Sequence, residues 1–296
     1  VTGVQTCALP ISIHINAFNF PCWGMLEKIA PTFLAGVPAI VKPATVTSYL
    51  TELMVQEIIS SGILPPGALQ LVCGSAGDIL DHVTLQDVVT FTGSAATGRK
   101  LKQHPAIIEN SVRFNMEADS LNFSMLGKDA APGTNEFNLF IKEVSREMTV
   151  KAGQKCTAIR RIIVPDEYTG AVADALKLRL AEIRLGDPSV EGVKMGPLAS
   201  TGQVTEVKSR VTELLQSCEL AYGNMNDFDV TGADKMKGAF MPSLLLYCKD
   251  GLKNNAPHDI EAFGPVSTLM GYKNTDDAIE LARKGKGSLV GSVFTA

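Results

Sequence analysis

The chain has 296 residues, of which 45% are hydrophobic and 20% charged, which is enough apolar material for one large or two ordinary domains. Its 26 glycines and 15 prolines exclude collagen-like and disordered compositions. A net charge of −4 argues against nucleic-acid or polybasic membrane partners, and no apolar run is long enough to span a bilayer. Six irregularly spaced cysteines without a CxxC pair fit neither a disulfide framework nor a zinc site. We therefore expect a cytosolic α/β protein that holds no metal.

Both ends of the chain look truncated. Val1–Ile11 has no basic region, and Pro10 and polar residues interrupt its short apolar stretch, so it is not a signal peptide. The segment is typical of a sequencing adapter translated in frame, and a ragged natural N-terminus is the alternative. Residues 292–296 predict a strand with no tail after it. We expect the native sequence to begin at about residue 12.

Short apolar runs alternate with helical patterns along the chain. The N-terminal part predicts strands over 37–41, 69–73 and 87–91, and helices over 50–58, 76–82 and 94–104. Strands separated by helices indicate right-handed βαβ units in a parallel sheet. After residue 117 we predict helices over 137–148, 170–183 and 202–216, a strand over 161–164 and a loop over 186–196. The pattern favours two α/β lobes, 12–118 and 119–296.

A glycine-rich turn is the first candidate binding site. Gly93, Ser94 and Gly98 follow a predicted strand and open a helix, where backbone N–H groups and the helix dipole favour a phosphate. The turn matches neither GxGxxG nor a P-loop, and taken alone it favours the alternative of ordinary helix capping. Lys42 lies at the end of another strand, the edge at which open α/β sheets bind ligands, and a solvated surface lysine is the alternative.

Cys156 and Glu117 are the candidate catalytic residues. Cys156 follows a helix that ends in glycine, and it has Lys155 beside it, a setting that activates a thiol as a nucleophile. The other cysteines lie in more apolar surroundings. Glu117 ends an apolar strand at the lobe boundary, where a carboxylate can act as a general base. A buried structural cysteine and an exposed glutamate are the alternatives.

Six motifs in this order resemble the aldehyde dehydrogenase family. They are Asn19-Phe20-Pro21, Lys42-Pro43-Ala44, Phe91-Thr92-Gly93-Ser94, Glu117, Gly153-Gln154-Lys155-Cys156 and Glu261-Ala262-Phe263-Gly264-Pro265-Val266. Each motif alone is weak, but together they span some 245 residues. The resemblance implies an aldehyde dehydrogenase-like α/β fold with a Rossmann-type cofactor lobe (12–118) and a catalytic lobe (119–296). The sequence departs from common members in having Glu-Ala-Asp after the base position.

The resemblance also implies roles for single residues. Cys156 attacks the aldehyde, Asn19 and the Cys156 N–H stabilise the oxyanion, and Glu117 activates water to hydrolyse the resulting thioester. The residues implied in cofactor binding are Gly93 and Ser94 at the pyrophosphate, Lys42 and Glu261 at the two riboses, and Phe263 and Thr45.

The cofactor and the substrate are inferred from details of this resemblance. Thr45 stands where many NAD-using relatives have Glu, so we expect NADP in preference to NAD. Segments such as KAGQKCTAIRRIIVP resemble the dehydrogenases of phenylacetate catabolism, which implies a CoA-linked semialdehyde. The intact protein is expected to be a homo-oligomer.

Two other interpretations stay open. The chain is a truncated, inactive reading frame of such an enzyme, or it is a nucleotide-binding protein that uses the 93–98 turn. The second lacks a Walker lysine and an acidic magnesium cluster. Within the dehydrogenase interpretation, Glu117 favours release of a free acid over transfer of the acyl group to CoA.

Overall fold

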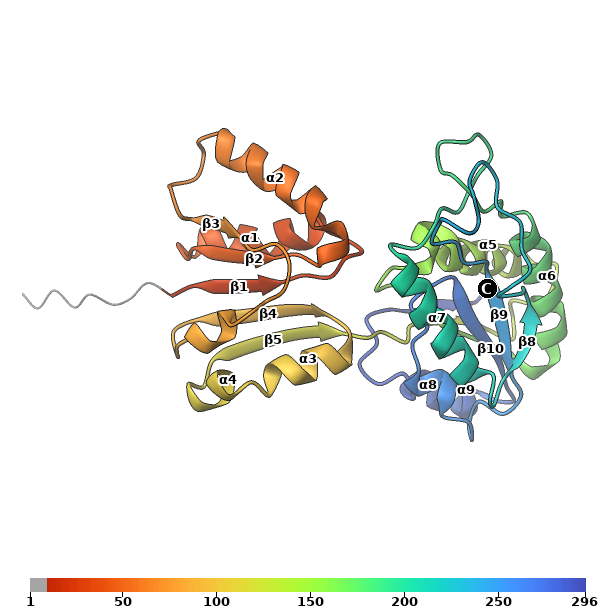
Figure 1. The fold of residues 1–296 in the computed structure, drawn as a ribbon. Coiled ribbons are helices and arrows are strands. Elements are labelled where there is room, and N and C mark those ends of the chain that lie inside the picture. Colours follow the sequence, from red (N-terminus) through yellow and green to blue (C-terminus); the bar gives the residue numbers. More distant parts are fainter. Residues whose placement is uncertain (1–9) are drawn as a thin grey trace, which may run out of the picture. The chain divides into compact units, whose positions relative to one another are not determined.

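A computed structural model describes residues 10–296, which divide into two compact units at Asp119/Ser120 (Figure 1). The predicted adapter segment, 1–11, lies almost entirely outside the described residues. None of the helices described between residues 10 and 296 is both long and apolar enough to cross a bilayer.

The first unit is built on a five-stranded parallel sheet with the order β3-β2-β1-β4-β5. Its strands are β1 (Ser12–Ile15), β2 (Ala39–Lys42), β3 (Leu69–Leu71), β4 (Val88–Gly93) and β5 (Arg113–Ala118). The chain runs from β1 outward to β3 and then returns to β4 on the other side of β1. This reversal makes the carboxyl ends of β1 and β4 the place where such sheets open a ligand crevice.

Helices cover both faces of this sheet. They are α1 (Trp23–Leu34), α2 (Ser48–Ser60), α3 (Ala95–Lys102) and α4 (Pro105–Glu109). Residues of α1 and α2 form one core with Ala39 and Val41 of β2. On the other face, Val89 and Phe91 of β4 pack with α4 and with the 3₁₀ helix Ile79–His82. The predicted helix over 76–82 is thus a single 3₁₀ turn.

Strand β1 lies at the centre of the sheet, yet the apolar pattern did not predict it. Ile13 and Ile15 face one core, whereas Ser12 and His14 point to the opposite face and are buried there. His14 Nε2 lies 2.8 Å from Ser12 Oγ and 3.2 Å from Thr32 Oγ1 of α1. Burial, followed by the nearby charge of Lys28, lowers the pKa of His14 to about 4, so the ring is neutral at pH 7.

The second unit contains a six-stranded sheet with the order β11-β6-β7-β10-β9-β8. Its strands are β6 (Phe123–Leu126), β7 (Arg161–Pro165), β8 (Glu219–Tyr222), β9 (Leu244–Cys248), β10 (Val266–Tyr272) and β11 (Gly291–Phe294). Only the edge strand β8 runs antiparallel to its neighbour in the described sheet.

Five helices flank this sheet: α5 (Asn135–Thr149), α6 (Thr169–Ala181), α7 (Thr201–Leu214), α8 (Ala256–Asp259) and α9 (Thr275–Arg283). Helices α5 and α6 bury their apolar stripes on one face, with Ile162, Val164 and Leu269 of the strands. Helices α7 and α9 pack on the other face with Ile163, Leu246 and Met270 (Figure 1). Because successive strand residues point to opposite faces, β7 supplies both cores.

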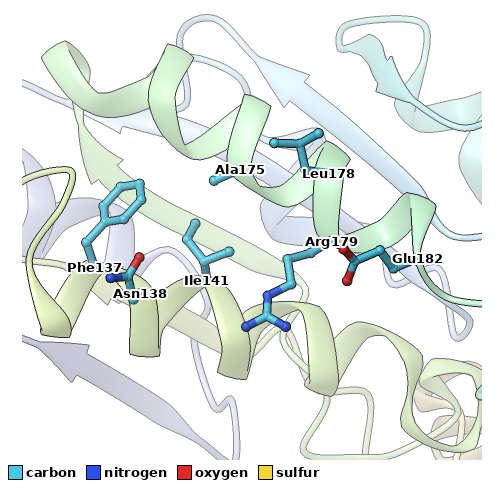
Figure 2. Close-up of a pocket in the computed structure, with 7 residues that line it drawn as sticks. All are labelled: Phe137, Asn138, Ile141, Ala175, Leu178, Arg179 and Glu182. Atoms are coloured by element: carbon cyan, nitrogen blue, oxygen red, sulfur yellow. The ribbon is translucent and has the colours of Figure 1, made fainter.

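A surface hollow of about 350 Å³ lies between α5 and α6 (Figure 2). Phe137 and Ile141 of α5 line it on one side. Leu178 and Arg179 of α6 line it on the other, together with Glu182, which follows α6. None of the predicted site residues lies in this hollow, so it is not the candidate active site.

Candidate active site

The nine predicted site residues are divided between the two units. The first unit holds Asn19, Lys42, Thr45, Gly93, Ser94 and Glu117, and the second holds Cys156, Glu261 and Phe263. Each group lies on the loops and element ends of its own unit. We describe the two groups in turn.

The Asn19 segment connects β1 to α1 and is fastened to the start of α2. Thr47 Oγ1 donates to the carbonyl of Phe18 over 3.0 Å, and Thr51 Oγ1 donates to the carbonyl of Pro21 over 3.1 Å. These two bonds fix the backbone on either side of Asn19. A bend with both flanks held can present one amide side chain in a fixed direction, as an oxyanion donor requires.

Lys28 of α1 lies at the sheet reversal, and no sequence motif singles it out. Its Nζ donates to Asn16 Oδ1 and to Thr92 Oγ1, both over 2.8 Å, and so joins the ends of β1 and β4. Burial lowers the pKa of Lys28 to about 8, against the opposing charges of Glu27 and Glu117. Because Glu117 is also the β5 neighbour of Thr92, the cation lies close to the predicted base.

The N-terminus of α3 is already capped. Ser94 Oγ accepts from Thr97 N over 3.3 Å, as expected of an N-cap residue. The amide of Ala95 donates over 2.8 Å to Asp119 Oδ1. The expectation of free N–H groups at this turn therefore needs correction, because a carboxylate already uses one of them. Asp119 belongs to the Glu-Ala-Asp run in which the sequence departs from common relatives.

Lys42 and Thr45 lie together at the carboxyl end of β2. Lys42 is half-buried, and this burial lowers the pKa of its ammonium group, while the nearby Cys73 opposes the shift. Thr45 is exposed, and its hydroxyl donates to the carbonyl of Gly74 over 3.4 Å. This corner therefore combines a cation with a neutral hydroxyl, a donor set that suits a sugar or a phosphate ester.

In the second unit, Cys156 follows a backbone turn of unusual conformation. Lys151, Ala152 and Gly153 have φ values of 54°, 51° and 69°, so three successive residues are left-handed. A side chain at Gly153 would overlap the carbonyl group of Gly264, which explains why this position requires glycine. The Gly-Gln-x-Cys and Phe-Gly-Pro motifs thus touch through their backbones.

Gln154 and Asn122 hold this turn in place. Gln154 Oε1 accepts from Ala199 N over 2.8 Å, and its Nε2 donates to the carbonyl of Phe263 over 3.2 Å. Asn122 is fully buried, and its Nδ2 donates to the carbonyls of Cys156 and Ala158 over 2.7 and 2.9 Å. An amide that bonds both carbonyls fixes the direction of the Cys156 backbone. The sequence offered no sign of this role beyond a polar residue at the lobe boundary.

Arg160 is the second residue that sequence reasoning missed here. Its side chain is 3% exposed, and its guanidinium donates to the carbonyls of Gly264 and Gly153 over 2.7 and 2.8 Å. It also lies 3.4 Å from Glu261 Oε1 and 5.3 Å from the centre of the Phe263 ring. The structure therefore brings Glu261 and Phe263 together with the Cys156 turn through one buried cation.

The charges near Cys156 differ from the expected ones. Lys155, the neighbour in sequence, pairs with Glu147 over 2.6 Å and is largely buried. Instead, Lys151 and Arg160 lie near the Cys156 sulfur. Burial lowers the pKa of both cations, and the sulfur opposes this shift, as Glu261 also does for Arg160. Cations beside a sulfur favour the thiolate, which is the nucleophilic form of cysteine.

The parallel sheet of the first unit and the thiol turn of the second unit both fit the aldehyde dehydrogenase class that the motif order implied. The family model described as "Aldehyde dehydrogenase family" matches residues 4–296, and the chain belongs to this family. The predicted fold class is thereby confirmed.

Two named relatives show which members of the family the chain is similar to. The chain is 51% identical over 285 residues to 3,4-dehydroadipyl-CoA semialdehyde dehydrogenase of Aromatoleum evansii, covering 96% of this chain and 55% of that protein. It is 27% identical to betaine aldehyde dehydrogenase of Staphylococcus aureus, solved in complex with NAD+, with a TM-score of 0.84 and coverage of 97% and 55%. The chain thus spans about half the length of these relatives.

Proposed function

We propose that this chain carries the chemical residues of an NADP-dependent dehydrogenase that oxidises a CoA-linked semialdehyde to a carboxylic acid. The observation that carries the proposal is the Cys156 turn. Asn122 fixes its backbone, and Lys151 and Arg160 supply positive charge beside its sulfur. A thiol held in this way suits attack on a carbonyl carbon.

The residues of the first unit fit a dinucleotide. Lys42 and Thr45 at the end of β2 would hold the adenosine ribose and its phosphate, and Ser94 at the start of α3 would meet the pyrophosphate. These positions flank the sheet reversal between β1 and β4, where such ligands bind. NADP, when bound, accepts the hydride of the oxidation. Glu261 and Phe263 would serve the nicotinamide end.

The remaining two roles are those of the oxyanion donor and the general base. The Asn19 amide would donate to the oxyanion formed when Cys156 attacks the aldehyde. Loss of one such donor typically lowers the rate by about 10²- to 10³-fold. Glu117 would remove a proton from the water that hydrolyses the thioester, and the product is then a free acid.

The test is an absorbance assay for NADPH with the full chain, a semialdehyde linked to CoA, and the same semialdehyde without CoA. Cys156→Ser should abolish turnover. Glu117→Gln should keep a burst of about one equivalent of NADPH and lose steady turnover, because the thioester accumulates. Steady acid production by Glu117→Gln would exclude it as the base, and turnover that survives Cys156→Ser would overturn the proposal.

The cofactor and substrate preferences have their own outcomes. We expect kcat/KM to be higher with NADP than with NAD, and Thr45→Glu to reverse this order because a carboxylate repels the extra phosphate. A parent chain that prefers NAD would refute the cofactor assignment. The 51% identical relative is named for a CoA semialdehyde, which supports the substrate class. Equal kcat/KM for the free semialdehyde would contradict it.

A further inference from the structure

Two buried cysteines face each other across the edge of the second sheet. Strand β8 pairs antiparallel with β9, with Glu219 opposite Tyr247. Continued by one residue, this register places Cys218 opposite Cys248. Opposite residues of an antiparallel pair have Cα atoms about 4.5–5.5 Å apart. Disulfides need a Cα separation of roughly 4.4–6.8 Å, so the backbone suits a bond between these two residues.

The two sulfur atoms also point toward the same place. Asn254 Nδ2 lies 3.4 Å from Cys248 Sγ and 3.7 Å from Cys218 Sγ. The Asn254 side chain is itself fixed, because its Nδ2 donates to the Ser217 carbonyl over 3.0 Å and its Oδ1 accepts from Ala256 N over 3.0 Å. Both thiols belong to the core formed with α7 and α9, and both are reduced in the structure.

The environment shifts the pKa values of the two thiols in opposite directions. A hydrogen bond from the Cys218 thiol lowers the pKa of Cys248 to about 7, against the effect of burial. The same hydrogen bond, with burial, raises the pKa of Cys218. Cys248 is therefore the sulfur that loses its proton more readily, and thiolates are the reactive form in oxidation.

We propose that Cys218 and Cys248 are an oxidisable pair that forms an intrachain disulfide with a hydroperoxide. The Cys248 thiol first releases its proton to solvent, and the thiolate attacks a peroxide oxygen and breaks the O–O bond, which leaves a sulfenic acid and hydroxide. The hydroxide takes up a proton from solvent, equal to the one that Cys248 released, and becomes the first water. The Cys218 sulfur then displaces hydroxide from that sulfenic acid, and its thiol proton completes a second water. Two thiols lose two electrons, and one hydrogen peroxide is reduced to two waters. This chemistry involves none of the residues of the proposed function.

Burial determines how this reaction proceeds and what it changes. Cys218 is 7% exposed and Cys248 is not exposed at all, so peroxide reaches them only when the surrounding structure opens locally. The pair should therefore react more slowly than the exposed Cys73. The bond would then fasten the edge strand β8 to β9 and close the long connection between them, which restricts the unfolded chain.

The experiment uses the full chain with Cys156→Ser, which removes the predicted nucleophile as a competing target of peroxide. After peroxide treatment and alkylation, trypsin should release residues 211–235 joined to 238–249, each with one cysteine, at a mass lower by two hydrogen atoms. Dithiothreitol should separate the two peptides. The oxidised protein should melt roughly 5–10 °C higher than the reduced one.

Two further variants serve as matched controls. Adding Cys73→Ser should leave the joined peptides intact, and adding Cys218→Ala should abolish them. If Cys218→Ala disturbs folding, the peptide map of the Cys156→Ser chain still decides. The proposal is overturned if residues 218 and 248 stay fully alkylated after the exposed cysteines are oxidised, or if either joins a different cysteine.

Discussion

Replacing Gly153 by alanine should weaken the second unit. Gly153 has φ 69°, and an added methyl group would overlap the backbone of Gly264. The left-handed conformation costs alanine roughly 1–2 kcal/mol, and overpacking against a fixed carbonyl costs about 1–3 kcal/mol. We therefore expect the free energy of unfolding to fall by about 2–5 kcal/mol in urea titrations followed by circular dichroism.

The same substitution should disturb the candidate nucleophile. Arg160 donates to the carbonyls of both Gly153 and Gly264. Pushing these two segments apart should therefore weaken these hydrogen bonds. Because these bonds hold the Cys156 turn, the rate at which iodoacetamide alkylates Cys156 should differ from that in the parent chain.

Gly170→Ala is the matched control. Gly170 lies in α6 with open space around its Cα, so alanine should leave stability unchanged or raise it by up to about 1 kcal/mol. A Gly153→Ala chain that stays within about 0.5 kcal/mol of the parent would refute the steric argument.

Three more predictions concern charge. Arg160→Met should lower the free energy of unfolding by about 3–5 kcal/mol, because it leaves Glu261 buried without its cation, and adding Glu261→Gln should recover part of the loss. Burial lowers the pKa of His258 from 6.5 to about 4, so the unfolded chain binds this proton first and stability should fall between pH 6.5 and 4. Melting curves of His258→Gln should show a weaker pH dependence over that range. Asp119→Asn keeps a cap for Ala95 N but removes a negative charge, so NADP should bind about 2- to 5-fold more tightly.

Each of these has a clear contrary result. Equal losses for Arg160→Met with and without Glu261→Gln would mean that the ion pair does not determine the cost. An unchanged acid slope in His258→Gln would assign the pH effect to other groups. Weaker NADP binding by Asp119→Asn would indicate that the carboxylate belongs to the cofactor site instead of competing with it.

The sequence predicted β2, β3, β4, β7 and β11 but missed other strands, among them β1 at the centre of the first sheet. Strand β1 escaped because His14 and Ser12 interrupt its apolar alternation, and Thr32 of α1 compensates for them from 18 residues away. Such compensation is visible only after the helix packs. By contrast, α5 was predicted well because its apolar residues recur at helical spacing on one buried stripe.

The candidate site likewise contains residues that the sequence could predict and residues that it could not. Motif order pointed to Cys156 and Glu117, and their catalytic roles stay predictions. The groups around them were not predictable, because Asn122, Arg160 and Lys28 are ordinary residues until the fold brings their partners near. Lys155 shows the opposite case. It is next to Cys156 in the sequence, but it pairs with Glu147 of α5.

The bonds around Asn122 have a consequence for how the protein is made. Asn122 Oδ1 accepts from Val290 N over 2.8 Å, and Ser120 Oγ accepts from Leu289 N over 3.0 Å. These contacts join the first residues of the second unit to residues almost 170 positions later. During translation, the Cys156 backbone therefore cannot reach its final support until residue 290 has left the ribosome, and such long closures fold slowly. The thiol turn should be among the last parts of the unit to become ordered.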